Sequence, residues 1–86
     1  MSVVLDTKMV DNIMAEYPVL EIALQSGVVS IKMVRELLNV DRWYMQDLYK
    51  QLVMAGAVTG VSTSAFRATQ QLTMYLKSRV SEPKSN

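Results

Sequence analysis

The sequence predicts a mainly α-helical domain with one small β-hairpin. Apolar residues recur at helical spacing along most of the chain, Gly27 and Gly56 each end such a segment, and the pattern becomes strand-like after Gly56. Half of the 86 residues are hydrophobic and a fifth are charged, which is typical of a packed domain rather than a disordered chain. We therefore expect a single domain over residues 1–80.

Two helices are expected before the first glycine. Asp6 is a suitable N-cap for the first helix, over about residues 6–16. Proline is disfavoured inside a helix but tolerated in its first turn, so Pro18 is expected to start the second helix, which ends near Ser26. The expected buried side chains are Met9, Val10, Ile13, Met14, Tyr17, Val19, Leu20, Ala23 and Leu24.

Two more helices are expected between the two glycines. Ser30 is a suitable N-cap for a helix that ends near Asn39. Asp41 is a suitable N-cap for a longer helix that runs to Ala55, where Gly56 provides the stop. The expected buried side chains are Ile31, Val34, Leu37, Leu38, Met45, Leu48, Leu52 and Ala55.

The region after the second glycine has two interpretations. Residues 57–61 and 66–69 have β-compatible patterns, and the small polar run 62–64 between them suits a turn, which favours a β-hairpin. The alternative is one continuous helix that is capped within the polar run and continues to Val80, because several apolar residues partly suit the helical period.

Residues 70–80 are helical in both interpretations, and the polar residues 81–86 are expected to form a disordered tail. The helices predicted over 6–16 and 70–80 are both amphipathic and lie near the two ends of the chain. We expect these two helices to pack together or to mediate a symmetric homodimer.

The residue types that are missing exclude several functions. Without Cys or His, the chain lacks the usual ligands of zinc and the nucleophile–histidine pairs of many hydrolases. We therefore expect no enzyme activity, no metal and no cofactor. No apolar run approaches the roughly 18 residues of a membrane span, and Met1–Leu5 lacks the basic flank of a signal peptide, so we expect a cytoplasmic protein without a membrane anchor.

The formal net charge of +1 is unevenly distributed. Residues 1–27 carry one Lys against four carboxylates, whereas residues 28–86 carry eight Lys and Arg against four carboxylates. The basic part contains the two consecutive helices, joined by a short connection and followed by the hairpin. This is the order of elements in a winged helix-turn-helix, whose second helix enters the major groove of DNA.

The same region resembles a known family. The segment from Ser30 to Arg67 reads SIKMVRELLNVDRWYMQDLYKQLVMAGAVTGVSTSAFR and resembles the C-terminal gamma domain of FtsK-type DNA translocases. The family's Ser-Ile pair, a Val three residues later, its Gly-apolar-Val helix end and its wing Arg correspond to Ser30, Ile31, Val34, Gly56, Val58 and Arg67. With PVLEIAL from Pro18, the resemblance covers residues 18–69. It implies a winged helix that binds double-stranded DNA, with Arg67 as a wing contact.

The start of the expected recognition helix departs from the family. The family has an aromatic residue, an Asn and an Arg there, whereas this chain has Arg42, Trp43 and Tyr44. Asp47 stands at a position that is basic in the family, and a carboxylate repels phosphate. The target sequence of the family is therefore not expected to apply. The Gly-rich phosphate loop of an ATPase motor is also absent from the sequence.

The candidate DNA-binding residues lie on the two consecutive helices and the hairpin. Arg42, Gln46 and Lys50 are four residues apart on one helix face, which suits a base-reading amide between two phosphate contacts. The same spacing is also typical of a helix face that is merely solvated. Trp43 either stacks on DNA or packs on the wing, and packing is the more common role of a lone Trp. The full set of candidates is Ser30, Lys32, Arg35, Arg42, Trp43, Tyr44, Gln46, Lys50 and Arg67.

Two functions from different classes follow. The first is a sequence-specific double-stranded DNA-binding protein, such as a small transcriptional or mobile-element regulator. The second is a protein-interaction module on the same scaffold, such as a phage or plasmid inhibitor of a host protein, with Trp43, Tyr44 and Tyr49 as its contact surface. The near-neutral charge and Asp47 favour the second function.

Overall fold

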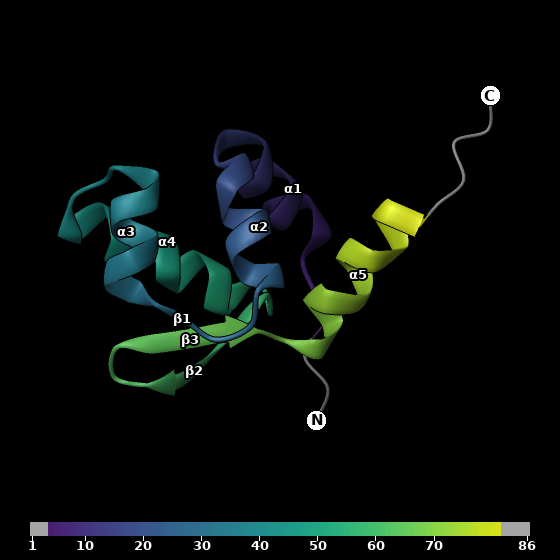
Figure 1. Cartoon of the computed structure of the whole chain (residues 1–86). Coiled ribbons are helices and arrows are strands. Elements are labelled where there is room, and N and C mark those ends of the chain that lie inside the picture. The colour runs from purple at the N-terminus through teal and green to yellow at the C-terminus, as the bar shows by residue number, and fades with distance from the viewer. Residues whose placement is uncertain (1–3, 82–86) are drawn as a thin grey trace.

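The structure, a computed structural model, describes residues 4–81 (Figure 1). The elements in chain order are α1 (Thr7–Glu16), α2 (Pro18–Gln25), β1 (Val29–Ser30), α3 (Ile31–Leu38), α4 (Arg42–Met54), β2 (Val58–Ser62), β3 (Ala65–Ala68) and α5 (Gln70–Ser81). All of the helices expected before the second glycine are present, with ends within two residues of the predicted ones. The last helix includes Ser81, and the rest of the expected disordered tail lies outside the described residues.

Side-chain caps start four of the helices, and at α5 the Thr69 hydroxyl accepts a hydrogen bond from the Leu72 N–H at 3.2 Å. The carboxylates of Asp6 and Asp41 and the hydroxyl of Ser30 each accept a hydrogen bond from the backbone N–H three residues later, at 3.1, 2.7 and 2.9 Å. Each bond satisfies one of the donors that a first helical turn leaves unpaired. All three predicted caps are therefore confirmed, and they explain where α1, α3 and α4 begin.

Three residues adopt left-handed backbone conformations where the chain leaves a helix. Gly27 and Gly56 have φ of 112° and 75°, after α2 and α4, and Asn39 has φ of 56° after α3. This region disfavours most side chains but suits Gly and, to a lesser degree, Asn. The left-handed Asn39 turns the chain from α3 into α4.

The strands form one antiparallel sheet in the order β1-β3-β2. Val29 of β1 pairs with Phe66 of β3, and the pairing of β2 with β3 contains an irregularity between Gly60 and Ser62. The hairpin prediction is confirmed, and the alternative of one continuous helix from the polar run to residue 80 is wrong. A backbone bond from the N–H of Ile31 to the carbonyl oxygen of Ser64, at 2.9 Å, ties the turn between the strands to the start of α3.

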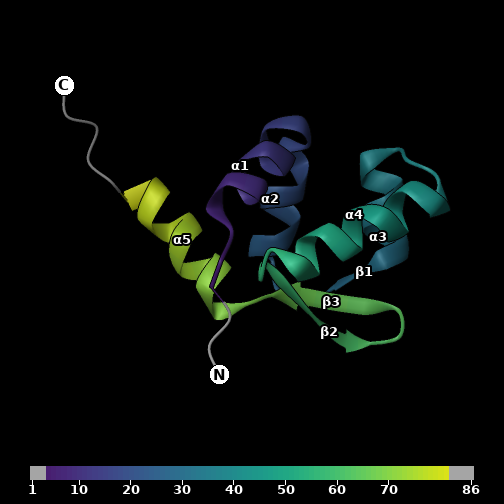
Figure 2. The same ribbon diagram turned by 180° about the vertical axis from the view of Figure 1, so that it is seen from behind.

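The helix pair α3–α4 with the adjoining hairpin is a winged helix-turn-helix, to which α1 and α5 are added. Figures 1 and 2 show the hairpin below the α3–α4 pair, with α5 beyond the opposite end of the sheet from the hairpin turn. The buried core draws on every element: Val10, Ile13, Met14, Leu20, Ala23, Leu24, Val29, Val34, Leu38, Met45, Leu48, Leu52, Ala55, Ala57, Val58, Phe66, Leu72 and Leu76.

Leu37 was expected to be buried, and this expectation is wrong. Leu37 is 50% exposed, whereas Val34 and Leu38 on the same helix are buried. Successive residues point about 100° apart around a helix axis, so Leu37 lies at the edge of the buried stripe that includes Leu38. The short helix α3 therefore buries a narrower face than the sequence pattern predicts.

The two terminal helices pack together, as predicted. The Tyr75 hydroxyl of α5 donates a hydrogen bond to Asp11 Oδ1 of α1 at 2.8 Å, and Arg79 Nη1 lies 3.5 Å from the same oxygen. The hydrogen bond and the Asp11 carboxylate raise the pKa of Tyr75. Below these polar groups, Val10 of α1 and Leu72 of α5 are fully buried in the common core. The terminal helices are thus part of the folded domain.

Candidate nucleic-acid interface

Helix α4 has one buried side and one side that faces solvent. Met45, Leu48 and Leu52 are buried, and their spacing defines the core side of the helix. Figure 2 shows α4 above the hairpin, with its N-terminal end and the hairpin turn at the same end of the molecule. The side away from the core is exposed and carries Arg42, Trp43, Gln46, Asp47, Lys50 and Met54. We call this set the outer face of α4.

Trp43 lies at the start of the outer face. Its side chain is 73% exposed, so the expectation that it packs on the wing is wrong. The guanidinium carbon of Arg42 lies 5.8 Å from the Trp43 ring centroid, within cation–π range. In the first turn Trp43 points away from the buried stripe of α4, which explains why it has no place in the core. The structure therefore presents an arginine and an indole together at the end of the helix.

Tyr44 and Tyr49 contact other rings of the protein, unlike the more exposed Trp43. Tyr44 points towards the junction of α1 and α2, where its ring lies edge-on to Tyr17 with centroids 6.2 Å apart. A hydrogen bond with Tyr44, and then desolvation and the Glu16 carboxylate, raise the pKa of Tyr17 to about 12. Tyr44 is 41% exposed, so part of its ring stays open to solvent beside Trp43.

Tyr49 has a structural environment of its own. Its half-buried ring packs on Phe66 of β3, with centroids 5.3 Å apart. A Cβ atom at Gly60 would lie 3.0 Å from the Tyr49 hydroxyl, so the close approach of β2 to this ring suits glycine. Tyr49 thus packs α4 against both strands of the hairpin.

The outer face of α4 has a small positive net charge. Arg42 and Lys50 supply two positive charges and Asp47 supplies one negative charge. The Asp47 carboxylate accepts a hydrogen bond from Gln51 Nε2 at 3.1 Å, which holds it on this side of the helix. Gln46 is exposed and its side-chain amide has no hydrogen-bond partner among residues 4–81.

Two apolar residues near the end of α4 are exposed, which the sequence pattern alone does not predict. Met54 is 78% exposed and Val53 is 44% exposed. The helical spacing is a partial signal for Met54, because Trp43, Lys50 and Met54 are spaced seven and four residues apart and so share a side of the helix. The outer face therefore begins and ends with an exposed apolar side chain.

The candidates on α3 lie near the turn of the hairpin. The Ser30 hydroxyl caps α3, and the adjoining Ile31 N–H bonds to Ser64 in the turn between β2 and β3. Lys32, in the first turn of α3, is exposed, and Arg35, about one turn further along, is half-buried. The structure thus brings the start of α3 and the hairpin turn together. Across residues 4–81, neither Lys32 nor Arg35 forms a side-chain hydrogen bond or ion pair with the outer face of α4.

Arg67 is separated from the other candidates. Side chains alternate between the two sides of a strand, and the neighbouring Phe66 packs towards α4 through its contact with Tyr49. Arg67 therefore points to the other side of the sheet, beside its β2 partner Thr59. The wing position that the family resemblance assigns to Arg67 is present in the sequence, but its side chain does not extend the outer face of α4.

Comparisons with known proteins add no family. A scan against protein-family models, a search of curated proteins and a search of solved structures each found no match. Across residues 4–81, no three acidic side chains come together in a group suited to a metal ion. In the same part of the chain, every helix is too short or too polar to cross a membrane.

Proposed function

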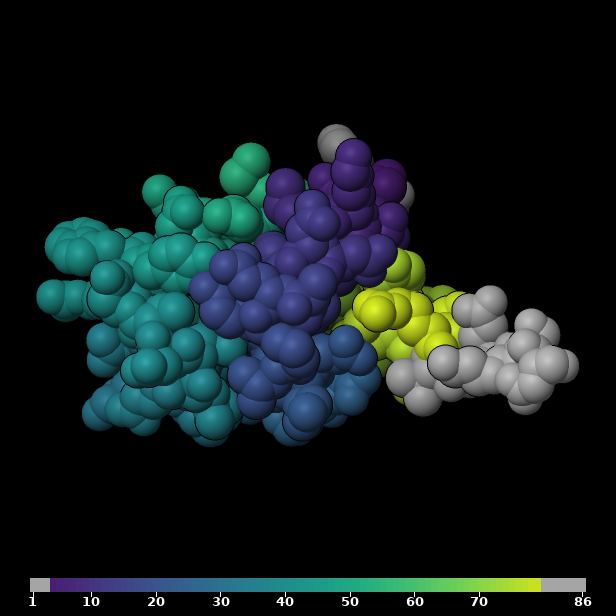
Figure 3. Space-filling model, turned by 90° about the horizontal axis from the view of Figure 1, so that it is seen from above, coloured from purple at the N-terminus to yellow at the C-terminus, as the bar shows by residue number. Residues whose placement is uncertain are grey.

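We propose that this protein binds double-stranded DNA through the outer face of α4, placed in the major groove. The observation that carries the proposal is an exposed helix of 13 residues at the second position of a helix-turn-helix, with the hairpin turn at the same end of the molecule. In Figure 3 the teal α3–α4 region forms one end of the molecule and the yellow α5 lies towards the other, so this end projects freely in that view.

Four residues of the outer face have chemistry suited to DNA. The Gln46 amide has both a donor and an acceptor, which match the N7 and N6 groups of adenine in the major groove. Arg42 and Lys50 flank Gln46 one turn away on each side and suit phosphate oxygens. Trp43 offers a flat apolar surface to the sugar and base edges. We leave Arg67 out of this interface because it points to the other side of the sheet.

The test is selection of the protein against random duplex DNA at about 0.1 M salt, where charges are screened beyond roughly 10 Å. We expect an enriched motif. On that motif, Gln46→Ala should remove preference at one base pair, at a cost of about 1–3 kcal/mol. Lys50→Ala should weaken binding to all sequences alike and lower the salt dependence by about one ion.

The matched control is Lys8→Ala, which removes a positive charge from the exposed side of α1 and should change neither affinity nor motif. If Lys8→Ala and Lys50→Ala weaken DNA binding equally, the loss of affinity reflects net charge alone, which would contradict a contact between Lys50 of α4 and DNA. Equal loss on every sequence for Gln46→Ala would contradict its role as a base reader.

A second candidate function is protein binding through the same outer face. It is favoured by the exposed apolar side chains of Trp43 and Met54, together with the Asp47 carboxylate, since aromatic and Met residues are enriched at protein interfaces. If the selection retains no DNA, this function replaces the first. Binding of the partner should then be lost in Trp43→Ala and kept in Lys50→Ala.

A further inference from the structure

A cavity of about 860 Å³ opens between the end of α2, the loop that leads to β1, strand β3 and helix α5. Its volume lies within the range of about 300–1,000 Å³ that is usual for small-molecule sites. The cavity is lined by Leu24, Gln25, Gly27, Val28, Arg67, Ala68, Gln70, Thr73, Leu76 and Lys77. None of these residues belongs to the outer face of α4, so the cavity is a feature separate from the proposed DNA interface.

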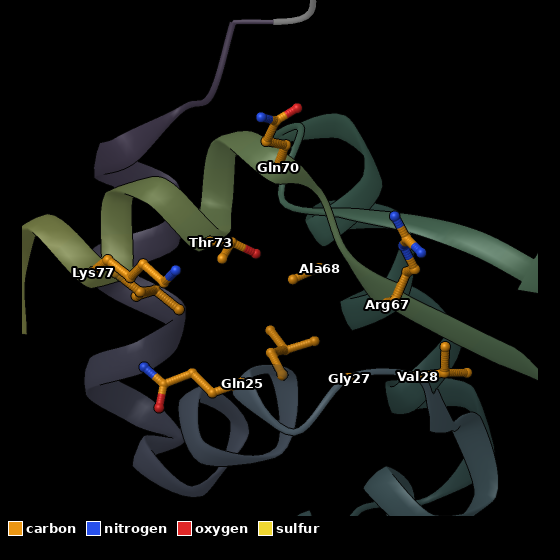
Figure 4. A pocket seen from close by; sticks show the side chains of 10 residues that line it. Gln25, Gly27, Val28, Arg67, Ala68, Gln70, Thr73 and Lys77 are labelled. Carbon is orange, nitrogen blue, oxygen red and sulfur yellow. The ribbon is translucent and has the colours of Figure 1, made fainter.

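The lining combines an apolar floor with polar groups at two ends. Leu24 and Leu76 are each 2% exposed, whereas Val28 is 56% exposed and forms a wall. Figure 4 shows Lys77 and Gln25 at one end of the cavity and Arg67 and Val28 at the other, with Ala68 and Thr73 between them. An elongated apolar molecule can therefore lie on the apolar floor, with each of its ends close to polar side chains.

The charges of the lining have one sign. Arg67 and Lys77 are its ionisable residues, and no carboxylate lines the cavity. The Arg67 side chain forms no hydrogen bond or ion pair with any of residues 4–81, and the residue opposite it on β2 is the uncharged Thr59. A guanidinium forms strong, charge-assisted hydrogen bonds with a carboxylate. The electrostatics of the cavity thus favour an anion.

We propose that this cavity binds a small apolar carboxylate, with the apolar part over Leu24 and Leu76 and the carboxylate at Arg67. The proposal accounts for the position of Arg67, which the DNA interface does not use. It does not rest on DNA binding, since the cavity lies on β3, α2 and α5 rather than on α4.

The test is an NMR titration of the whole protein with octanoate, octanol and octylammonium, which share a chain but differ in charge. We expect octanoate to shift the amide signals of Gln25, Val28, Ala68 and Thr73 and to bind at least about fivefold more tightly than octylammonium. Equal affinity for octanoate and octylammonium would overturn the proposal. So would shifts confined to the apolar residues at the two ends of α4.

Two variants separate the cavity from general charge effects. Arg67→Gln should weaken octanoate binding roughly tenfold and leave octanol binding unchanged, because a charge-assisted hydrogen bond is lost. The matched control Arg42→Gln removes an arginine from α4 and should leave octanoate binding as it is. Equal effects of the two variants would overturn the assignment of Arg67.

The remaining occupant to test is a second copy of the chain. If the cavity signals shift on dilution of the protein alone, the cavity is an interface between two copies and the carboxylate proposal is wrong. Absence of such shifts, together with the charge preference, leaves the small anion as the occupant. The DNA selection is independent of this titration, so either proposal can fail while the other stands.

Discussion

Trp43 is suited to both candidate functions. It is 73% exposed and lies against the Arg42 guanidinium, a contact worth about 0.5–1 kcal/mol at an exposed site. The same pair suits DNA, where arginine contacts phosphate and indole contacts sugar, and a protein partner, where both residue types are common hot spots. Asp47, on the same face of α4, favours the protein partner, because its carboxylate repels phosphate but not a basic protein surface.

Asn39 is expected to determine how firmly α3 is joined to α4. Its φ of 56° is a conformation that costs most side chains about 1–2 kcal/mol and glycine almost nothing. Asn39→Ala should therefore lower the free energy of unfolding by about 1 kcal/mol, and Asn39→Gly should keep or raise it. Urea denaturation measures both variants. Equal destabilisation by Ala and Gly would show that the side chain matters more than the backbone conformation.

Tyr17 gives the protein a dependence on alkaline pH. Hydrogen bonding with Tyr44 raises the pKa of Tyr17 to about 12, whereas an unfolded tyrosine titrates near 10. The folded state then keeps a proton that the unfolded state loses, so this stabilisation is complete below about pH 10 and is lost as the pH rises towards about 12. Titration of the tyrosine ring carbons by NMR should show this pKa, and Tyr44→Phe should move it towards 10. An unchanged value in Tyr44→Phe would exclude Tyr44 as the main cause.

The helices show which features the sequence can predict. The caps Asp6, Ser30 and Asp41 were predictable because an N-cap depends on the residue itself and the next three backbone positions. The exposure of Trp43 and the direction of Arg67 were not predictable, because both depend on which side of an element meets a partner distant in the chain. The spacing of apolar residues indicates that a helix or strand has a buried face, but not how wide that face is or which element packs against it.

In helix α3, mutation can measure how wide the buried face is, which the spacing of apolar residues does not predict. Leu38 is buried and Leu37 is 50% exposed, although both are apolar and adjacent. We expect Leu38→Ala to lower the free energy of unfolding by about 2–4 kcal/mol and Leu37→Ala by at most about 1 kcal/mol. Thermal or urea denaturation of the two variants provides the comparison. Similar losses would mean that α3 buries a wider face than this structure shows.

The stability of the whole molecule depends on elements outside residues 18–69. A winged helix of about 60 residues buries only about 60% of its unfolded surface, which leaves little margin of stability. Here α1 and α5 add Val10, Leu72 and Leu76 to the same core and join each other through Asp11 and Tyr75. Helix α5 also forms one wall of the cavity, where it supplies Thr73 and Lys77.

Helix α5 is therefore expected to contribute to global stability. Leu72 is fully buried and Met74, two residues away, is 62% exposed, so the two provide a matched pair on one helix. Leu72→Ala should lower the free energy of unfolding by about 3 kcal/mol through lost burial and a cavity, whereas Met74→Ala should change it by about 0.5 kcal/mol or less. A loss of that size is a large part of the roughly 5–15 kcal/mol that holds a small domain together. If Leu72→Ala instead leaves the unfolding midpoint unchanged at several protein concentrations, α5 is only loosely docked on the winged helix. The cavity would then lack a firm wall, and the titration with octanoate would be expected to fail with it.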